Sequence, residues 1–392
     1  MAKVQTKLLR PVYINAAFRS PIGRFGGSLK HLSAGQLAAK LLKSAIAKSK
    51  TSEVDSVFLG HARQAGAGPN TARQATIFSG LNENIPAYTL NQACASGLTA
   101  IMTGVDKIQL GQAEKVWAGG VESMSNTPYL LANARWGQRL GNDRIIDGMY
   151  QDGFFCPMSD MVMGQTVENN LVREFKISRK EQDEYALKSQ LRAKAAIEAG
   201  LYNDEILSIA AEGKNEGLEK DEHVRFDSSA ESLSTLAPVF NEKGTITAGN
   251  SSGITDGASW LLLSSKKNDY SMVEVLGYSI TALAPQRMGL GPVSATQDLL
   301  SSFNVKMNQL AAVELNEAFA AQVIACQRTL KISEDKLNPR GGAIALGHPI
   351  GATGARITTT LVHQIKASEQ GLGLATLCVS GGMGFSLLLR AV

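Results

Sequence analysis

The sequence predicts an α/β protein whose core is built twice from alternating strands and helices. Strand-like and helix-like runs alternate along the first third of the chain and again along the last third, with a more charged segment between them. Glycine occurs 38 times in 392 residues, while aromatic residues make up 6%, a composition that suits tightly turned layers. A chain of this length exceeds one ordinary domain of about 100 to 200 residues, so two core units are expected.

The first unit alternates strands and helices in βαβ order. Because parallel neighbours are joined by crossover helices, this order indicates a mostly parallel sheet. Strands are predicted over Val12–Ala16, Val57–Leu59, Tyr88–Asn91 and Val116–Gly119. Helices are predicted over Ser33–Ala47, Thr71–Phe78 and Leu98–Leu110.

The second unit retraces this pattern toward the end of the chain. Strands are predicted over Val273–Ile280, Ala312–Leu315, Ala375–Val379 and Phe385–Leu389, and helices over Thr296–Phe303, Phe319–Leu330 and Ala352–Ile365. Both units set a reactive residue at a helix start, Cys94 in the first and His348 in the second. Each also reaches a Gly-Gly pair after the following strand, at residues 119–120 and 381–382. We infer an internal duplication that produces two similar layered halves.

An insertion of different character separates the two halves. It contains Ser178-Arg-Lys-Glu181, a capping box in which hydroxyl and carboxylate satisfy the first N–H groups of a long charged helix ending near Ala199. The predicted division is therefore an N-terminal half over 1–121, an inserted segment over 122–249 and a C-terminal half over 250–392.

The charge pattern argues against nucleic acid and membranes as partners. The formal net charge is +4, and no basic run is interleaved with aromatic residues, as nucleic-acid binding would require. No stretch approaches the roughly 20 apolar residues of a membrane span. The balance remains compatible with a polyanionic nucleotide as ligand.

Cysteine usage and the chain ends point to a reducing compartment. The four cysteines show no CxxC spacing, so neither a metal site nor a disulfide framework is expected. The first ten residues are basic but lack the apolar run of a signal peptide, and the last three, Arg390-Ala-Val392, carry no peroxisomal address. We expect a cytoplasmic protein.

Cys94 has the setting of a nucleophile. It lies in Asn91-Gln-Ala-Cys-Ala-Ser-Gly97, between a strand-like run and a helix-like run. A thiol at the first turn of a helix feels the positive end of the helix dipole, which should raise its thiolate fraction at neutral pH. A buried structural thiol is the alternative reading.

Three segments far downstream favour the catalytic reading. Asn316-Glu-Ala-Phe319 follows a short apolar strand, Gly347-His-Pro-Ile-Gly351 opens a helix, and Cys378-Val-Ser-Gly-Gly382 closes a strand. Together they supply a carboxamide, an imidazole and a second thiol. A cysteine with a distant histidine is the sequence pattern of an activated thiol, because such partners meet in the fold and not in the chain.

With these segments the chain resembles the thiolase family, the acetyl-CoA C-acyltransferases, essentially from end to end. Further matching motifs are Arg19-Ser-Pro-Ile-Gly-Arg-Phe-Gly-Gly27, Gln64-Ala-Gly66, Gly119-Gly-Val-Glu-Ser-Met-Ser125, Ala248-Gly-Asn-Ser-Ser-Gly253 and Asp256-Gly-Ala258. The resemblance implies an α-β-α-β-α sandwich of two similar halves with an inserted loop domain that covers coenzyme A. It also implies a homodimer or homotetramer and no tightly bound cofactor or metal.

The implied reaction is the reversible condensation of two acetyl-CoA to acetoacetyl-CoA and CoA through an acyl-cysteine intermediate. Such chemistry needs a nucleophile, a base for the α-proton and donors for two oxyanions. Cys94 matches the nucleophile, and His348 matches the base that deprotonates it and donates to one oxyanion. Cys378 resembles the second thiol, which exchanges the α-proton. Asn316 resembles the residue that holds a water in the enolate oxyanion hole, although it could instead cap the following helix.

Further residues are assigned by the same resemblance. Backbone N–H groups at Cys94 and near Ser380 would form the second oxyanion hole. Residues expected at the coenzyme A and acyl site are Arg225 at the adenine end, Ser252 at the pantetheine arm, and Met163, Met288 and Ala248. The chain departs from the family at Ser380, where glycine is usual, and at Val162, where short-chain biosynthetic members often carry histidine.

Three other functions are compatible with the sequence. A longer-chain 3-ketoacyl-CoA thiolase of fatty acid β-oxidation would use the same residues. A serine hydrolase could use Gly249-Asn-Ser-Ser-Gly253 as a nucleophile elbow, with Ser251, Asp256 and His348 as its triad. A non-catalytic acyl-CoA binding protein would keep the fold without turnover.

Overall fold

Eleven strands form one twisted sheet in a computed structural model that describes residues 4–5, 10–138, 140–211, 213–366 and 371–392. The order along the sheet is β13-β14-β15-β12-β2-β11-β6-β4-β5, with β1 beside β12 and β3 beside β11. The strands are β1 Val4–Gln5, β2 Val12–Arg19, β3 Gly23–Arg24, β4 Ser56–His61, β5 Ala87–Leu90, β6 Lys115–Ser123, β11 Thr255–Ser264, β12 Val273–Ala282, β13 Leu310–Leu315, β14 Leu372–Val379 and β15 Met383–Ala391.

The expectation of a mostly parallel sheet is wrong. Within the described residues, the parallel pairs are β4 with β5, β4 with β6, and β13 with β14. The neighbours toward the middle of the sheet run antiparallel. The physical reason lies in the connections. A tight turn at Ser380–Gly382 joins β14 to β15 and reverses the chain, whereas a parallel pair needs a long crossover.

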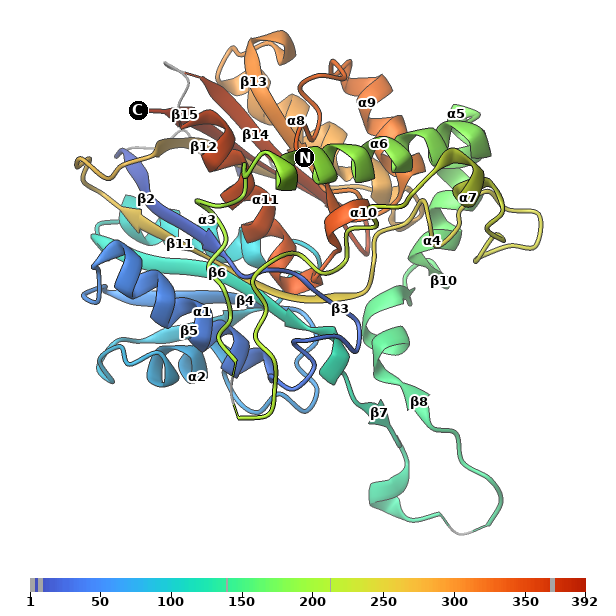
Figure 1. Cartoon of the computed structure of the whole chain (residues 1–392), viewed down its shortest axis with the longest axis horizontal. Coiled ribbons are helices and arrows are strands. Elements are labelled where there is room, and N and C mark those ends of the chain that lie inside the picture. The colour runs from blue at the N-terminus through green and yellow to red at the C-terminus, as the bar shows by residue number, and fades with distance from the viewer. Residues whose placement is uncertain (1–3, 6–9, 139, 212, 367–370) are drawn as a thin grey trace.

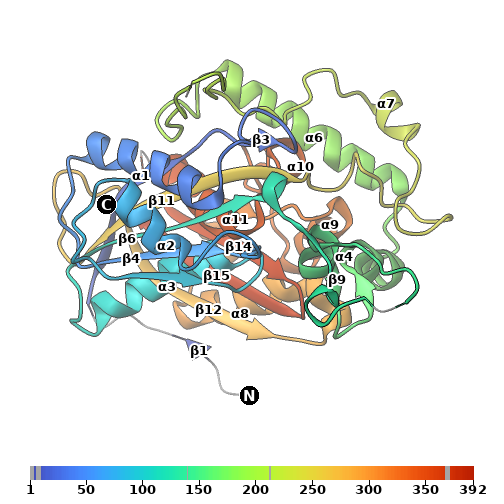
Figure 2. The ribbon, with the colours of Figure 1, turned by 90° about the horizontal axis from the view of Figure 1, so that it is seen from below.

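The helices lie in three layers around this sheet. Helices α1 and α2 cover the outer face of the first half, α8 lies against the strands of the second half, and α3 and α11 contact each other and strands of the sheet. The main helices are α1 Ala34–Ser49, α2 Thr71–Phe78, α3 Ser96–Gln109, α8 Gly291–Ser302, α9 Ala320–Leu330, α10 Ala343–Leu346 and α11 Ile350–Ile365. Figures 1 and 2 show α11 near the centre of the molecule. The predicted layered fold is confirmed.

Strand directions reveal the duplication. In β4-β6-β11-β2 the successive pairs are parallel, antiparallel and antiparallel, and β13-β14-β15-β12 repeats that series. Helix α3 precedes β6 as α11 precedes β14, so the two central helices correspond. The strand β11, which was not among the predicted ones, pairs with β2 and β6 of the first half. The predicted boundary at residue 250 therefore places β11 in the C-terminal half, although the strands it pairs with belong to the N-terminal half.

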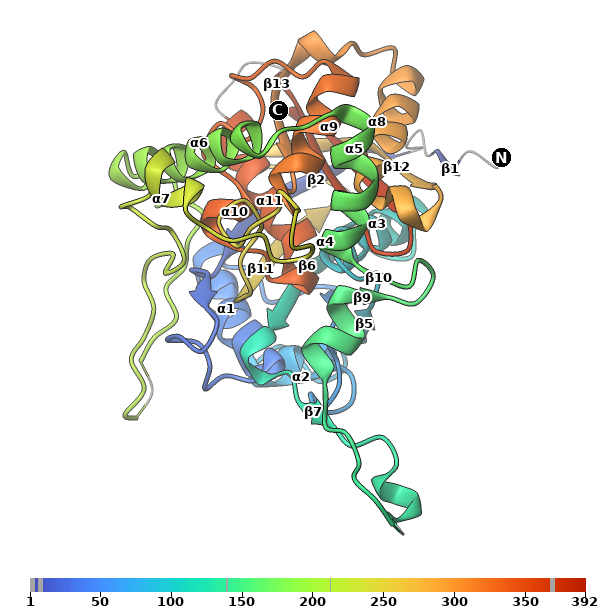
Figure 3. The same cartoon turned by 90° about the vertical axis from the view of Figure 1, so that its right-hand side faces the viewer.

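The inserted segment forms a long helix, an extended hairpin and short helical turns. Ser178 caps α6 (Arg179–Glu198) with the predicted capping box, since its hydroxyl accepts from the Glu181 N–H and Glu181 accepts from the Ser178 N–H. The hairpin of β7 (Tyr129–Leu130) and β8 (Ile146–Asp147) projects from the body in Figures 1 and 3. Smaller elements are β9 Phe155–Cys156, β10 Met161–Val162, α4 Met163–Thr166, α5 Arg173–Phe175 and α7 Ala230–Ser234, with helical turns at Met124–Asn126, Ala134–Trp136, Tyr150–Phe154, Val167–Val172, Pro285–Leu290 and Met307–Gln309.

The central helix α11 shows why these layers fit together. Every residue from Ile350 to His363 is buried, because strands and helices surround the helix on all sides. Such a helix has no polar face toward water and is instead rich in small residues and threonine. Among the described residues, no helix is both long enough and apolar enough to cross a membrane.

Candidate active site

A tight turn holds Cys94 between β5 and α3. Ala93 adopts φ +48°, a left-handed conformation that costs free energy in a residue with a Cβ. Ser96 stabilises the turn, because its hydroxyl accepts from the Gln92 N–H at 2.9 Å and donates to the Ala93 carbonyl at 2.7 Å. Helix α3 begins at Ser96, so Cys94 precedes the first helical turn and does not lie within it, as the sequence had suggested.

The Cys94 thiol is protonated at neutral pH. Burial raises the pKa of Cys94 to about 11, although the guanidinium of Arg63 and the N–H groups of Ser380 and Cys94 itself lower it. The residue keeps one open side, so water tempers this desolvation without reversing it. The prediction of a raised thiolate fraction is therefore wrong for the unliganded site, because desolvation outweighs the donors. Attack by Cys94 requires a base.

His348 has the protonation state of such a base. Its Nδ1 lies 2.6 Å from the hydroxyl oxygen of Thr353, and that hydroxyl donates its single hydrogen to the Pro349 carbonyl at 3.0 Å. The hydroxyl can then only accept from Nδ1–H, which leaves the lone pair on Nε2. Burial, with the nearby charges of Arg356 and Arg63, lowers the pKa of His348 to about 3. The ring is thus neutral at physiological pH.

The second thiol, Cys378, lies at the end of β14 beside this pair. It is 3% exposed, and burial raises its pKa well above the ordinary value, with a further rise from the neighbouring Cys94. The turn that follows takes its positive φ values at Gly381 (+84°) and Gly382 (+86°) and not at Ser380. Serine therefore fits the position where the family usually has glycine, and its N–H still reaches the Cys94 thiol.

Asn316 presents a buried, unsatisfied carboxamide. The residue is 1% exposed, and neither its Oδ1 nor its Nδ2 has a hydrogen-bond partner among the described residues. It does not cap the following helix, whose N-cap is Phe319 without a side-chain hydrogen bond. Buried amides without protein partners commonly bind an ordered water or a ligand. The carboxamide is therefore suited to the water-holding role implied by the resemblance.

Both carboxylate oxygens of the neighbouring Glu317 accept hydrogen bonds, which anchor this segment. One carboxylate oxygen accepts from the Tyr185 hydroxyl and the Asn338 amide, both at 2.8 Å. The other accepts from the Ser189 hydroxyl at 2.7 Å and the Ile344 N–H at 3.0 Å. Glu317 thereby joins α6 and α10 to the loop that carries Asn316, a role that sequence reasoning missed.

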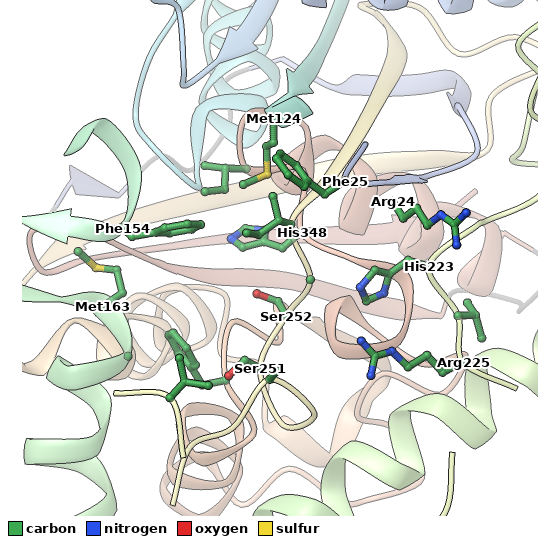
Figure 4. Close-up of a pocket in the computed structure, with 18 of the residues that line it drawn as sticks. Arg24, Phe25, Met124, Phe154, Met163, His223, Arg225, Ser251, Ser252 and His348 are labelled. Atoms are coloured by element: carbon green, nitrogen blue, oxygen red, sulfur yellow. The ribbon is translucent and has the colours of Figure 1, made fainter. Parts of the chain in front are cut away.

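A cavity of about 1000 Å³ opens beside His348. Figure 4 shows His348 near its centre, Phe154 and Met163 on one side, and Arg24, His223 and Arg225 on the other. The lining residues are Arg24, Phe25, Met124, Tyr150, Phe154, Val162, Met163, Gly164, Glu222, His223, Val224, Arg225, Phe226, Asp227, Val239, Phe240, Ala248, Ser251, Ser252, Gly253, Ile254, Phe319, His348 and Ile350. One end of the cavity is thus rich in charged and polar groups, and the other is apolar.

Most of the residues predicted to bind coenzyme A line this cavity. Arg225, Ser252, Met163 and Ala248 all line it. Met288 does not; it is 3% exposed and belongs to a buried core cluster. Cys94, Cys378 and Asn316 are also absent from the lining, but Cys94 packs against Met124 and Ile350, which are part of it.

A group of charged residues beside Cys94 escaped sequence reasoning. Glu122 is fully buried in β6, where it accepts from the N–H groups of Arg63 (3.1 Å) and Gly351 (2.8 Å) and lies 3.2 Å from Nε2 of His61. The signal that could have found them is the placement of Arg63 and Cys94 just after two parallel strands, β4 and β5, whose carboxyl ends share one edge.

The serine-hydrolase reading fails on geometry. The Ser251 hydroxyl donates to the Thr247 carbonyl at 2.7 Å, and Asp256 accepts from the backbone and hydroxyl of Ser125. His348 pairs with Thr353, so it has no carboxylate partner at Nδ1. The segment leads into strand β11, whereas a nucleophile elbow leads from a strand into a helix.

Comparisons with known proteins agree with this arrangement. The family model for the thiolase N-terminal domain matches residues 12–267, and that for the thiolase C-terminal domain matches residues 270–391. The acetyl-CoA acetyltransferase of Escherichia coli is 43% identical over 387 residues, which cover 96% of this chain and 98% of that protein. A protein of the same name from Chromobacterium violaceum is 44% identical over 389 residues, 97% of this chain and 99% of its own.

Two solved structures superpose closely on this chain. The crystal structure of the Bacillus anthracis acetyl-CoA acetyltransferase superposes with a TM-score of 0.95 at 41% identity, covering 99% of this chain and 100% of that one. Human mitochondrial 3-ketoacyl-CoA thiolase in complex with CoA superposes with a TM-score of 0.93 at 37% identity, covering 98% and 99% of the two chains.

Proposed function

The chain belongs to the thiolase family, and on that premise we propose that it is an acetyl-CoA acetyltransferase. It condenses two acetyl-CoA to acetoacetyl-CoA and CoA through an acyl group on Cys94, and it cleaves acetoacetyl-CoA with CoA in reverse. The names of its relatives support this substrate. The observation that carries the proposal is a protonated Cys94 thiol that has the N–H groups of Cys94 and Ser380 at its sulfur and packs against the cluster of Ile350. Two residues before Ile350 lies a neutral His348 with its lone pair on Nε2.

Acylation uses these groups in sequence. His348 accepts the thiol proton on Nε2 as Cys94 attacks the thioester carbonyl. The N–H groups of Cys94 and Ser380 stabilise the oxyanion, since preorganised donors act where charge develops. The carbon–sulfur bond to coenzyme A then breaks, and His348 returns the proton to the departing thiolate. Coenzyme A is a substrate here, and no tightly bound cofactor is required.

Condensation uses the second thiol. Cys378, as a thiolate, removes a methyl proton from the second acetyl-CoA, the enolate attacks the acyl carbon on Cys94, and the bond from that carbon to the Cys94 sulfur breaks. The proton on Cys378 then passes to the Cys94 thiolate, which restores both groups. A water held by Asn316 would stabilise the enolate oxygen, and His348 would donate to that oxygen only while it carries a proton on Nε2. Burial holds the pKa of Cys378 high, which makes its thiolate a strong base once formed.

The shape of the cavity supports a coenzyme A thioester as the ligand. Arg225 and Arg24 supply positive charge at the polar end for phosphate and adenine, and Ser252 lies between that end and His348 (Figure 4). At the other end, Val162, Met163, Phe240 and Phe319 make an apolar wall. That wall also favours the second candidate, a thiolase for longer 3-ketoacyl-CoA chains.

We infer a homodimer or homotetramer in the cytoplasm that acts without nucleic acid or membrane partners. The hairpin over residues 129–147 supports self-association, because it exposes several large apolar side chains. These are Tyr129, Leu131, Trp136, Leu140 and Ile145.

Mass spectrometry tests the division of labour between the thiols. After brief incubation with acetyl-CoA, the acetyl group should be found on Cys94 of the parent and of Cys378→Ala, and not on Cys94→Ala. Cys378→Ala should lose methyl-proton exchange and condensation by about 10²–10⁴-fold, as expected for a positioned acid–base group. Cys326→Ser, which changes a core thiol that donates to the Gly289 carbonyl, should keep both steps. A label on Ser251, or parental condensation by Cys378→Ala, would contradict the mechanism.

Rates across a series of 3-ketoacyl-CoA lengths decide between the two thiolase substrates. The acetyl-CoA acetyltransferase reading expects kcat/KM to be highest for acetoacetyl-CoA. A maximum at six carbons or more would instead support the longer-chain thiolase. Widening the apolar end by Phe240→Ala should raise kcat/KM for longer chains relative to acetoacetyl-CoA.

A further inference from the structure

Arg63 is a buried cation whose hydrogen bonds are mostly missing. It is 5% exposed and follows β4 by two residues. Its Nε and Nη1 have no hydrogen-bond partner among the described residues, and Nη2 makes one long contact, 3.4 Å to the Met149 carbonyl. The guanidinium lies 5.1 Å from the Phe154 ring centroid, a cation–π distance. A buried arginine usually has a full set of acceptors, so this one requires an explanation.

The chain fixes Arg63 beside the nucleophile. The Asn91 amide, three residues before Cys94, donates to the carbonyl of Ala62 at 2.9 Å, and its oxygen accepts from the Ala93 N–H. Ala62 and Cys94 pack against the same cluster of Met124, Met149 and Ile350. Gly153 leaves room for the guanidinium, since a Cβ there would lie 1.8 Å from Nη2. The backbone next to Arg63 is thus tied to the loop that carries Cys94, and the guanidinium lies against Gly153.

Apart from the guanidinium itself, the charges around this pair are negative. The groups whose charge affects Cys94 or Arg63 lie on β6, at the end of β14, just before α11 and in the inserted segment. They are Glu122, Cys378, His348, Asp147 and Asp152. Glu122 disfavours the Cys94 thiolate, but its oxygens are already engaged by His61, Gly351 and the Arg63 N–H. Apart from the guanidinium, the charges that act on Cys94 are negative.

We propose that the guanidinium of Arg63 supplies the charge that stabilises the Cys94 thiolate, which makes Arg63 a positioning residue for acyl transfer. The inference deepens the proposed function and rests on Cys94 as its nucleophile. A charge that is short of hydrogen bonds interacts more strongly with a nearby anion, because neither water nor fixed acceptors screen it. Phe154 stacks on the guanidinium and lines the cavity, so it keeps solvent from the charge on that side.

The same charge acts on both ends of the proton transfer. As the Cys94 proton moves to Nε2 of His348, Arg63 stabilises the sulfur anion and destabilises the imidazolium. The thiolate then forms its bond to the acyl carbon, the bond to coenzyme A breaks, and the proton on Nε2 passes to the departing thiolate. Arg63 therefore favours both the attack and the release of the proton, and it is unchanged at the end.

Alkylation of Cys94 by iodoacetamide, followed by peptide mass spectrometry from pH 6 to 10, tests the inference without acetyl-CoA. In Arg63→Met the alkylation rate at each of these pH values, which all lie below the parent pKa of about 11, should fall about tenfold, the equivalent of a midpoint raised by about one unit. Arg63→Lys, which keeps the charge, should raise that equivalent midpoint by less than half as much. Arg73→Met is the matched control, because the partly buried guanidinium of Arg73 donates to the Ile85 and Glu83 carbonyls instead.

An unchanged alkylation rate in folded Arg63→Met, judged by its circular dichroism, overturns the proposal. If that variant does not fold, Arg63→Lys decides alone, since the full loss of rate with the charge retained would equally overturn it. A parent enzyme that fails to turn over acetyl-CoA would contradict the proposed function and leave the alkylation result intact, so the two failures are distinguishable.

Discussion

At the scale of single residues, the site keeps its nucleophile and base neutral until substrate arrives. Burial raises the pKa of Cys94 to about 11 and lowers that of His348 to about 3, so the ion pair of thiolate and imidazolium is disfavoured in the unliganded protein. The reaction therefore depends on where the His348 proton lies. That position is set by Thr353, which accepts from Nδ1–H at 2.6 Å.

Thr353→Val should slow acylation of Cys94 by roughly tenfold or more. The change leaves a buried Nδ1–H without an acceptor, which costs about 1–3 kcal/mol, and it allows the tautomer with the proton on Nε2. The measurement is the single-turnover rate of acetyl transfer from acetyl-CoA.

Thr358→Val on the same helix is the control. Its hydroxyl donates to the Gly354 carbonyl at 2.8 Å and makes no contact with His348. Equal slowing in both variants would show that loss of a buried hydroxyl, and not the tautomer, is responsible.

At the scale of elements, the two central helices approach each other through glycines. A Cβ on Gly354 of α11 would lie 2.5 Å from the backbone N of Leu98 in α3, and one on Gly97 would lie 2.9 Å from the Gly351 carbonyl oxygen. Cys94 lies four residues before Leu98, and His348 lies six before Gly354. The spacing of the helices thus fixes the distance between nucleophile and base.

Gly354→Ala should destabilise the protein by about 3 kcal/mol and abolish most activity. Backbone atoms of α3 cannot move aside as a flexible side chain can, so the helices must separate, and overpacking of this kind typically costs about 1–3 kcal/mol or more. Urea unfolding and acetyl transfer by the folded fraction measure the two effects.

Gly35→Ala in α1 is the matched control. The nearest atoms to its Cβ would be side-chain atoms of Gln74 and not backbone, and alanine has the higher helix propensity. Its stability should change by less than about 1 kcal/mol with activity retained. If Gly354→Ala behaves in the same way, the close approach of α3 and α11 does not control the site.

At the scale of the whole molecule, the projecting hairpin is the feature that one chain does not explain. Trp136 is 83% exposed and Ile145 is 71% exposed, on a segment that leaves the body of the protein (Figure 3). Clusters of exposed apolar side chains on an extended arm are typical of surfaces that bind another protein. The proposed homo-oligomer would cover them.

Trp136→Glu combined with Ile145→Glu should lower the molar mass in light scattering from that of the parent oligomer to a smaller one. Burying two new carboxylates at an interface is costly without partners. Gln138→Glu, on the same hairpin, adds a charge without removing an apolar contact and should leave the mass unchanged. A parent protein with the mass of one chain would contradict the role given to the hairpin.

Several features of this protein could be predicted from sequence because they depend on neighbours in the chain. The capping box at Ser178, the helix that follows His348 and the duplicated order of strands and helices are local patterns, and the structure confirms each of them. The motifs around Cys94 and His348 identified the family for the same reason. The residues of each motif lie a few positions apart on one short loop, so their spacing can be read directly from the sequence.

Which of these loops meet, and in what electrostatic state, follows from the folded structure alone. Strand β11 was missed because both of its faces are buried, which removes the alternation that marks a strand. The antiparallel middle of the sheet, the choice of Thr353 as the partner of His348 and the approach of Arg63 to Cys94 all depend on contacts made by folding. Protonation followed from them too, because the helix setting of Cys94 is local, whereas the desolvation that outweighs it comes from every segment packed around the thiol.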